Sequence, residues 1–364
     1  MSPAKIEPTL REVVETLAPL ERTPCSPGER AAAEWLQERL AAVAGVEAEL
    51  EDEPSWGTFP PTAVGLGLAG ALAALLGLRS PRDDRRHGSR GRRALGALLA
   101  AATFAGIVDE AHNGPRFLRR LVRRRRITVN LIGRAGDPGA ERTLVVIAHH
   151  DAPQTGILFD QTLQRRIYER APRLVERFKT PLPQWWFGLA GPLATLLGRR
   201  RLGLVLGLLG TLLVADVLRS ETVAGANDNL SGVASLVALA ELLREAPIPG
   251  LRVLLVSCGA EETLQDGIRA FVGSHRHELD PETTCFVNLD TVGSPHLVLL
   301  EAEGPVRMEE YHGPWLRDLF ERRAEALGVH LRRGYRARAS TDSIIPSRAR
   351  YPTATLVSMA DWLA

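Results

Sequence analysis

The acidic and imidazole side chains of this sequence gather in four short motifs, each at one end of an apolar run. The motifs are HHD at 149–151, GANDN at 225–229, GAEE at 259–262 and NLD at 288–290. Histidine, aspartate and glutamate without cysteine form a nitrogen and oxygen donor set that suits zinc, with manganese or cobalt as alternatives. Carboxylates that were buried together would repel one another, and a pair of divalent cations would remove that cost. The motifs therefore predict a centre for divalent cations.

The elements that must position these motifs alternate between apolar strands and helices. This alternation predicts an α/β sheet that is covered by helices on both faces. In such a sheet the carboxyl ends of the strands form the crevice that binds ligands, so the four motifs are expected to converge there. The expected strands are 127–133, 143–148, 251–259, 285–292, 297–302 and 353–358, and the expected helices are 8–19, 27–44, 229–247 and 311–328.

The composition sets the class of protein. The chain has 364 residues, of which 45% are hydrophobic, so it can bury a sizeable core and is not disordered. Its 45 basic residues nearly balance 43 acidic ones, and the net charge of +2 does not favour nucleic acid as a partner. Cys25, Cys258 and Cys285 are far apart, which argues against a disulfide framework or a cysteine zinc site. The first residues lack the apolar run of a cleavable signal peptide.

Two stretches, 58–126 and 157–221, interrupt the α/β pattern. Each reads as an apolar helical hairpin with an arginine-rich tip, RSPRDDRRHGSRGRR in the first and RRR in the second. At about 1.5 Å per residue, the longest uncharged runs span roughly 26 Å, slightly less than a hydrocarbon core of about 30 Å. The hairpins therefore predict a protein that is associated with a membrane, as an integral protein. The alternative is that they are core helices of a large soluble protein.

Basic residues do not decide the orientation in a membrane. Arginines occur at both tips and also in RFLRRLVRRRR at 116–126, so the positive-inside count favours neither side. Beside an apolar hairpin, anionic lipid headgroups are a better partner for this basic run than nucleic acid. We therefore expect a lipid bilayer as a partner and no nucleic acid.

The order of the motifs resembles the di-zinc aminopeptidase family, the co-catalytic zinc exopeptidases. In both, His-x-Asp is followed by Asp-Asn before a helix, Glu-Glu after a strand and Asp after another strand. The resemblance implies a mixed, mostly parallel central sheet flanked by helices, with a peptide as substrate and two zinc ions as cofactors. It also implies a discontinuous peptidase domain made of 1–57, 127–156 and 222–364, into which the two hairpins are inserted.

The resemblance implies a ligand role for four residues. His149 and Asp290 would bind one zinc ion, Glu262 would bind the second, and Asp228 would bridge the two. Each residue also has an ordinary structural explanation. His149 could end a strand, Asp290 could belong to a turn, and Asp228 stands where a helix N-cap would stand. His150 is expected to be a neighbour of the site and not a ligand.

Two further residues would be catalytic by the same resemblance. Glu261 would be the general base toward the attacking water, and Asp151 would orient His149 through its other ring nitrogen. Glu261 and Glu262 could instead be acids in the first turn of a helix, where the helix dipole favours them.

The sequence departs from the family near its C-terminus. The family has a fifth ligand, a histidine, and the segment from Ser340 resembles the stretch that leads to it, but Ala364 comes first. His296 and His312 lie too early in the pattern to replace it. Either the ligand lies beyond Ala364 or the second zinc site is incomplete, with only Asp228, Glu262 and water.

These observations predict a membrane-associated zinc exopeptidase, of the aminopeptidase type. One alternative is a peptidase-like membrane protein that binds peptides without cleaving them, which the missing histidine would favour. Another alternative is a different amide hydrolase or an acyltransferase on the same scaffold.

Overall fold

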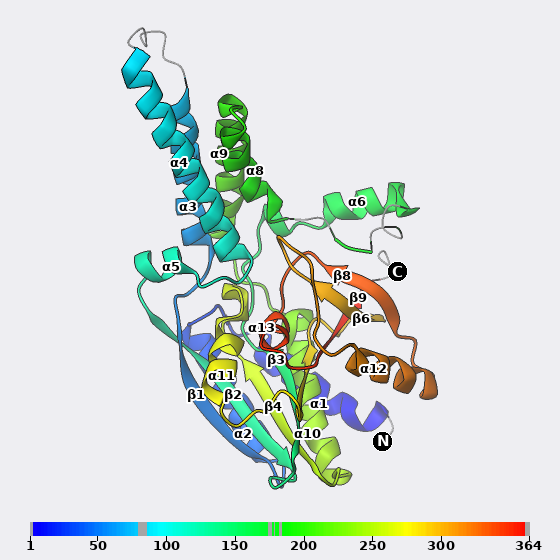
Figure 1. The fold of residues 1–364 in the computed structure, drawn as a ribbon. Coiled ribbons are helices and arrows are strands. Elements are labelled where there is room, and N and C mark those ends of the chain that lie inside the picture. The colour runs from blue at the N-terminus through cyan, green and yellow to red at the C-terminus, as the bar shows by residue number, and fades with distance from the viewer. Residues whose placement is uncertain (1–2, 79–85, 174–176, 178, 182–183, 361–364) are drawn as a thin grey trace.

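The computed structural model describes residues 3–78, 86–173, 177, 179–181 and 184–360 (Figure 1). Within these residues the chain forms one nine-stranded sheet in the order β1-β2-β4-β3-β5-β9-β6-β7, with β8 paired to β6. The strands are β1 Glu47–Ser55, β2 Arg126–Gly136, β3 Arg142–His149, β4 Leu251–Cys258, β5 Thr284–Leu289, β6 His296–Glu303, β7 Glu309–Glu310, β8 Arg332–Ala337 and β9 Thr353–Met359.

The centre of the sheet is parallel and its edges are mixed. Strands β4, β3, β5 and β9 all run in the same direction, whereas β2 is antiparallel to β4 and β6 is antiparallel to β9. The central strands are nearly continuous apolar runs, such as Val145–Ala148, because helices cover both of their faces. The predicted α/β class with a mixed central sheet flanked by helices is therefore confirmed.

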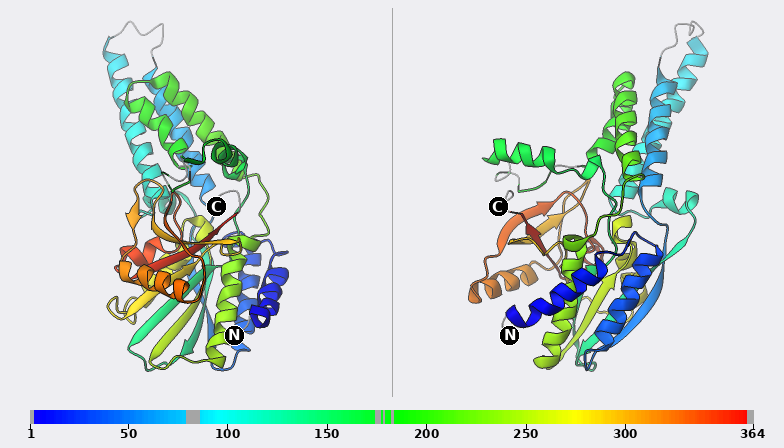
Figure 2. Two further views of the ribbon diagram at one scale, coloured as in Figure 1. Left: turned by 90° about the vertical axis from the view of Figure 1, so that its right-hand side faces the viewer. Right: turned by 180° about the vertical axis from the view of Figure 1, so that it is seen from behind.

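Helices cover both faces of the sheet (Figures 1 and 2). On one face α1, α2 and α10 form a core with β2, β3 and β4 through side chains such as Leu17, Leu36 and Val237. On the other face α11 and α13 pack on the same strands around Phe271. The helices of the two faces are α1 Pro3–Leu17, α2 Pro27–Ala41, α10 Ser231–Glu245, α11 Asp266–His275, α12 Pro314–Ala326 and α13 Ile344–Arg348.

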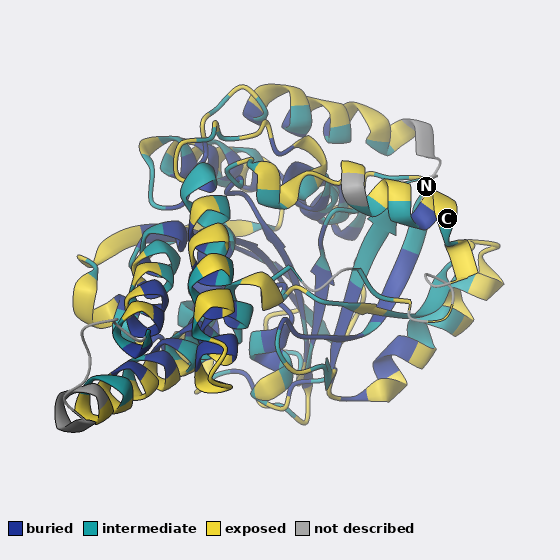
Figure 3. Ribbon diagram, turned by 90° about the horizontal axis from the view of Figure 1, so that it is seen from above, coloured by how far each residue is buried: buried dark blue, intermediate teal, exposed yellow. Residues whose placement is uncertain are grey.

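Four apolar helices form a bundle that projects from one end of the sheet (Figures 1 and 2). They are α3 Pro60–Gly77, α4 Arg86–Ala111, α8 Trp186–Leu196 and α9 Arg200–Val217, and α3 contacts each of the other three. Glycines let the helices approach closely, since a Cβ at Gly67 would lie 2.1 Å from Thr211 Oγ1. Figure 3 shows exposed residues along these helices, and they include Leu68, Leu72, Leu98, Val205 and Leu212.

Two helices of the described chain, Pro60–Gly77 and Arg90–Ala111, are long and apolar enough to cross a membrane. A core helix of a soluble protein can have the same length and composition. Residues 79–85, which belong to the predicted arginine-rich tip, lie outside the described residues, as do 174–176, 178 and 182–183 of the second insertion. The short helices α5 Phe117–Val122 and α6 Thr162–Arg170 follow the first hairpin and precede the second.

The two segments that the sequence predicts as insertions leave and re-enter the α/β part at paired backbone positions. Ser55 is paired with Arg126 at the end of the β1–β2 ladder, so the first insertion replaces a hairpin loop. Gln154 forms an isolated antiparallel bridge with Thr222 at the two ends of the second insertion. Because the ends of each insertion are held together, a long inserted segment adds little cost to closing the loop.

We predict that Phe271→Ala lowers the free energy of unfolding by about 3–5 kcal/mol. Phe271 is fully buried and packs α11 onto the sheet, so truncation leaves a cavity that the core cannot fill. The control is Leu327→Ala, because Leu327 is 77% exposed and the change there should stay within about 0.5 kcal/mol. Denaturant unfolding measures both values, and equal losses would contradict this account of the core.

Candidate metal centre

The four sequence motifs meet at one end of the parallel sheet. His149 ends β3, Glu261 and Glu262 follow β4 in the short helix η3 (Glu261–Thr263), and Asp290 follows β5. Asp228 lies in the turn η2 (Ala226–Leu230), directly before α10. Because β3, β4 and β5 are parallel neighbours, their carboxyl ends open at the same edge of the sheet. The fold therefore brings together side chains that are far apart in the sequence, from His149 to Asp290.

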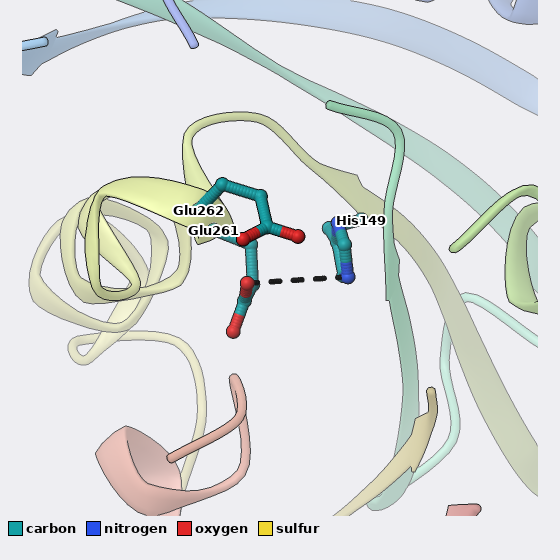
Figure 4. A group of neighbouring side chains, drawn as sticks. All are labelled: His149, Glu261 and Glu262. Atoms are coloured by element: carbon teal, nitrogen blue, oxygen red, sulfur yellow. Dashed lines mark ion pairs between the residues drawn. The ribbon is translucent and has the colours of Figure 1, made fainter. Parts of the chain in front are cut away.

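His149 lies between two groups of carboxylates. Its Nε2 atom is 3.2 Å from Asp228 Oδ1 and 4.0 Å from Glu261 Oε2. The possible ligand atoms of His149, Asp228 and Asp290 all lie within 4.8 Å of one another, and so do those of His149, Glu261 and Glu262 (Figure 4). His149, Glu261 and Asp290 are buried, whereas the side chain of Asp228 is 45% exposed to solvent.

Asp151 connects the imidazole to the backbone of the glutamate loop. Its two carboxylate oxygens accept hydrogen bonds from the backbone N–H groups of Glu261 at 3.1 Å and Glu262 at 3.0 Å. His149 Nδ1 lies 3.4 Å from Asp151 Oδ1 and 3.3 Å from the Asp151 carbonyl oxygen. A proton on Nδ1 that faces these oxygens leaves the lone pair of Nε2 toward the carboxylates.

Burial and mutual repulsion raise the pKa values of the clustered carboxyl groups. Burial raises the pKa of Glu262 well above its usual range, and the charge of Asp228 adds to the effect. Burial likewise raises the pKa of Glu261 strongly, against the charge of His149, and raises that of Asp290 to about 6. Burial alone would lower the pKa of His149, but Glu261, Asp151 and Asp228 together raise it well above its usual value.

The donor set fits a divalent cation. One imidazole cannot neutralise the carboxylates that surround it, so the cluster has an excess of negative charge when the acids are ionised. Nitrogen and carboxylate oxygen donors within a few ångströms of one another are the ligands that zinc takes in catalytic sites. A bound zinc ion would therefore balance the excess negative charge of the acids, which one histidine cannot do.

Sequence reasoning missed Asp342. This residue is 1% exposed, and among the described residues neither of its carboxylate oxygens has a hydrogen-bond partner on nitrogen or oxygen. Burial raises its pKa to about 7, although the charge of His149 lowers it. The signal in the sequence was its place in STDS, a polar run directly before an apolar turn, but such runs are common in loops.

His150 lies apart from the cluster. Its ring is fully buried, and Nδ1 lies 3.0 Å from Ser257 Oγ on the neighbouring strand. His150 directly follows β3, and successive side chains of an extended chain point to opposite faces, so the two imidazoles lie on different sides of the sheet. Neither His296 nor His312 belongs to a metal-binding group of the described residues.

Comparison with known proteins agrees with the predicted resemblance. Residues 210–360 match peptidase family M28. A leucine aminopeptidase precursor from Bacteroides thetaiotaomicron is 14% identical, with a TM-score of 0.51 over 97% of this chain and 84% of that chain. A Zn-dependent exopeptidase from Parabacteroides distasonis is 13% identical, with a TM-score of 0.50 over 96% of this chain and 83% of that one.

A third solved structure of similar fold is named as a cyclase and not as a peptidase. The glutaminyl cyclase from Fimbriiglobus ruber is 14% identical, with a TM-score of 0.52 over 98% of this chain and 85% of that chain. At these identities the solved structures show a shared fold. No curated protein sequence is detectably similar to the chain. The expected resemblance to the zinc exopeptidases is confirmed by the family match together with the fold.

We predict that Asp151→Asn lowers the affinity for zinc by about 10–100-fold. The amide would turn a donor toward the backbone N–H groups of Glu261 and Glu262, and it would hold His149 less firmly. Competition with a chelator measures the affinity. Asp137→Asn, in the exposed turn between β2 and β3, is the matched control and should leave zinc affinity unchanged. Equal affinities of all three proteins would show that Asp151 does not support the metal.

Proposed function

The chain has the fold of the zinc exopeptidases and carries the M28 peptidase pattern at residues 210–360, and from this premise we propose that it is a membrane-associated zinc aminopeptidase. The observation that carries the proposal is the convergence of one histidine and several acids at the carboxyl edge of the parallel sheet. Its substrates would be peptides with a free amino terminus close to a bilayer.

Four residues would hold the metal. His149, Asp228 and Asp290 form one group of possible ligands and would bind the first zinc ion. Asp228 would also reach the second ion together with Glu262, whose pKa responds to the charge of Asp228. When bound, the zinc ions polarise the scissile carbonyl and help to ionise the attacking water.

Glu261 would act as the general base. Its Oε2 atom lies on the side of His149, at 4.0 Å from Nε2, so it faces the space where the substrate carbonyl would lie. There it would take a proton from the attacking water and pass it to the leaving amine. Asp151 would keep His149 in one ring orientation during these steps, through the contacts at Nδ1.

We predict that Glu261→Gln lowers kcat by about 10²–10⁴-fold and leaves the zinc content nearly unchanged. Gln cannot accept a proton from water, but it has nearly the same size. Hydrolysis of a free-amine dipeptide measures turnover, and atomic absorption measures zinc. Glu245→Gln, at the exposed end of α10, is the control. Full activity of the Glu261 variant would reject the assigned base, whereas loss of zinc would show that Glu261 is a ligand.

The same scaffold could carry out another reaction of the peptide N-terminus. The glutaminyl cyclase from Fimbriiglobus ruber shares the fold, although its low identity carries no activity to this chain. A direct comparison separates the two functions. An aminopeptidase releases the first amino acid from peptides with a free amine, whereas a cyclase releases ammonia from peptides that begin with glutamine.

The helical bundle would lie in a membrane. Only 44% of the candidate span in α3 and 33% of that in α4 is buried within the protein, whereas the core helix of a soluble protein is mostly buried. Exposed leucines on these helices would contact lipid, and Arg199–Arg201 would lie among headgroups at the end of the second hairpin. In this proposal 58–126 and 157–221 are the membrane insertions of a peptidase domain made of 1–57, 127–156 and 222–364.

We predict that the expressed chain sediments with the membrane fraction and is released by detergent but not by high salt. Salt would release a protein that is held only by arginines on anionic headgroups, because it screens those charges. Apolar helices inside a bilayer would not respond to salt. Full recovery in the soluble fraction without detergent would contradict the proposed membrane association.

A further inference from the structure

The loop that carries Glu261 and Glu262 has an unfavourable backbone conformation. Ala260, Leu264 and Gln265 all have left-handed φ angles, of 51°, 72° and 66°, although none of them is glycine. Such conformations persist only where the surrounding contacts hold them, and they are frequent at functional sites. The groups that hold this loop therefore also decide where the Glu261 carboxylate lies.

Gln265 contacts the Glu261 side chain directly. It is 2% exposed, and its Nε2 atom donates hydrogen bonds to Glu261 Oε1 at 2.6 Å and to the Ser340 carbonyl at 2.9 Å. A carbonyl can only accept a hydrogen bond, which fixes the amide nitrogen on this side. The contact holds Oε1 of Glu261 and leaves Oε2 on the side of His149.

Asn113 holds Gln265 from the other side. It follows α4 at the root of the first insertion and is 3% exposed. Its Nδ2 atom donates to Gln265 Oε1 at 2.7 Å and to Ser340 Oγ at 2.9 Å. Both polar atoms of the Gln265 amide are thus paired, so this side chain has one orientation only.

Two buried arginines connect the same segment, residues 113–119 directly after α4, to the loop that carries Glu261. The Arg116 guanidinium donates to Asn113 Oδ1 and to the Asp266 carboxylate, next to Gln265. Arg119 donates to the Thr263 carbonyl at 2.6 Å and to Glu110 at 2.6 Å. Arg116 is 2% exposed and Arg119 is fully buried, so for these two the expectation that the basic run 116–126 faces lipid headgroups is wrong. Inside the protein, Asp266 and Glu110 balance the charges of the two arginines, and the Thr263 carbonyl accepts a further hydrogen bond.

We propose that Gln265 is a positioning residue for Glu261, and that Asn113 keeps Gln265 in place from the root of the first insertion. The inference rests on the proposed function, in which Glu261 is the general base. Gln265 does not touch the substrate. It restricts the carboxylate to the arrangement in which Oε2 meets the water, and the inserted helices supply the residue that orients it.

The test is Gln265→Met, which keeps the length of the side chain and removes the amide. We expect kcat to fall about 10–100-fold, because a base that is misplaced by about 1 Å loses rate to that extent. KM should stay within about twofold, since substrate binding does not use this contact. Zinc content and the thermal midpoint are measured alongside. Gln37→Met is the matched control, because Gln37 donates to the Ala48 carbonyl far from the site.

A double-mutant cycle with Asn113→Ala tests the second half of the proposal. Alone, this variant should lower kcat several-fold, because Gln265 Oε1 loses the shorter of its two hydrogen bonds and keeps only the one from Ser340 Oγ at 3.1 Å. In the Gln265→Met background it should have no further effect on kcat, since the two residues act through one contact. Equal effects of Asn113→Ala on kcat in both backgrounds would show that Asn113 acts independently of Gln265 and would overturn its role.

A second variant keeps the test decisive if Gln265→Met does not fold. Gln265→Asn suits the left-handed conformation and keeps the amide, but it is one methylene too short to reach Glu261. It should show the same loss of kcat. Unchanged kcat, or a loss that is matched by lost zinc, would overturn the positioning role while an active wild type leaves the proposed function in place. A wild-type chain without zinc-dependent hydrolysis would overturn both.

Discussion

The carboxyl groups of Glu261 and Asp290 are buried and that of Glu262 is half-buried beside His149, and each negative charge makes ionisation of the others less favourable. Other interactions must hold the acids in place, and a bound cation would balance their charge. Asp151 shows how the first condition is met. It contacts the backbone of the glutamate loop and the imidazole at once, so the proposed ligand His149, the proposed base Glu261 and the loop keep fixed positions relative to one another.

The fold meets the same constraint through its topology. Parallel strands place the ends of β3, β4 and β5 at one edge, and each strand end provides a part of the cluster. Behind the cluster, Glu29 of α2 accepts hydrogen bonds from the Ala260 backbone at 2.8 Å and from Thr128 at 2.8 Å. Burial raises the pKa of Glu29 to about 8. The scaffold therefore supports the glutamate loop with a buried acid that belongs to neither group of possible metal ligands among the described residues.

The sequence was sufficient for the parts of the site that lie at strand ends. Apolar runs identify the parallel strands, and a general rule of α/β sheets then brings His149, Glu262 and Asp290 together. The rule does not reach Asp342 or Gln265, because a single polar residue in a loop carries no periodic signal. Arg116 and Arg119 show the same limit. A run of arginines looks like a solvated surface in the sequence, and only the tertiary structure supplies the buried acids that pair with them.

The insertions have two kinds of attachment to the α/β part. At the ends of each insertion the attachment is a backbone pairing, of Ser55 with Arg126 and of Gln154 with Thr222. A short loop could therefore join each pair of positions in place of the helices. At the root of the first insertion the attachment is specific, since Asn113, Arg116 and Arg119 are buried against the loop that bears Glu261. Removing one partner of a buried charge pair is strongly unfavourable. These contacts therefore fix the end of α4 and the helix α5 relative to the loop that bears Glu261.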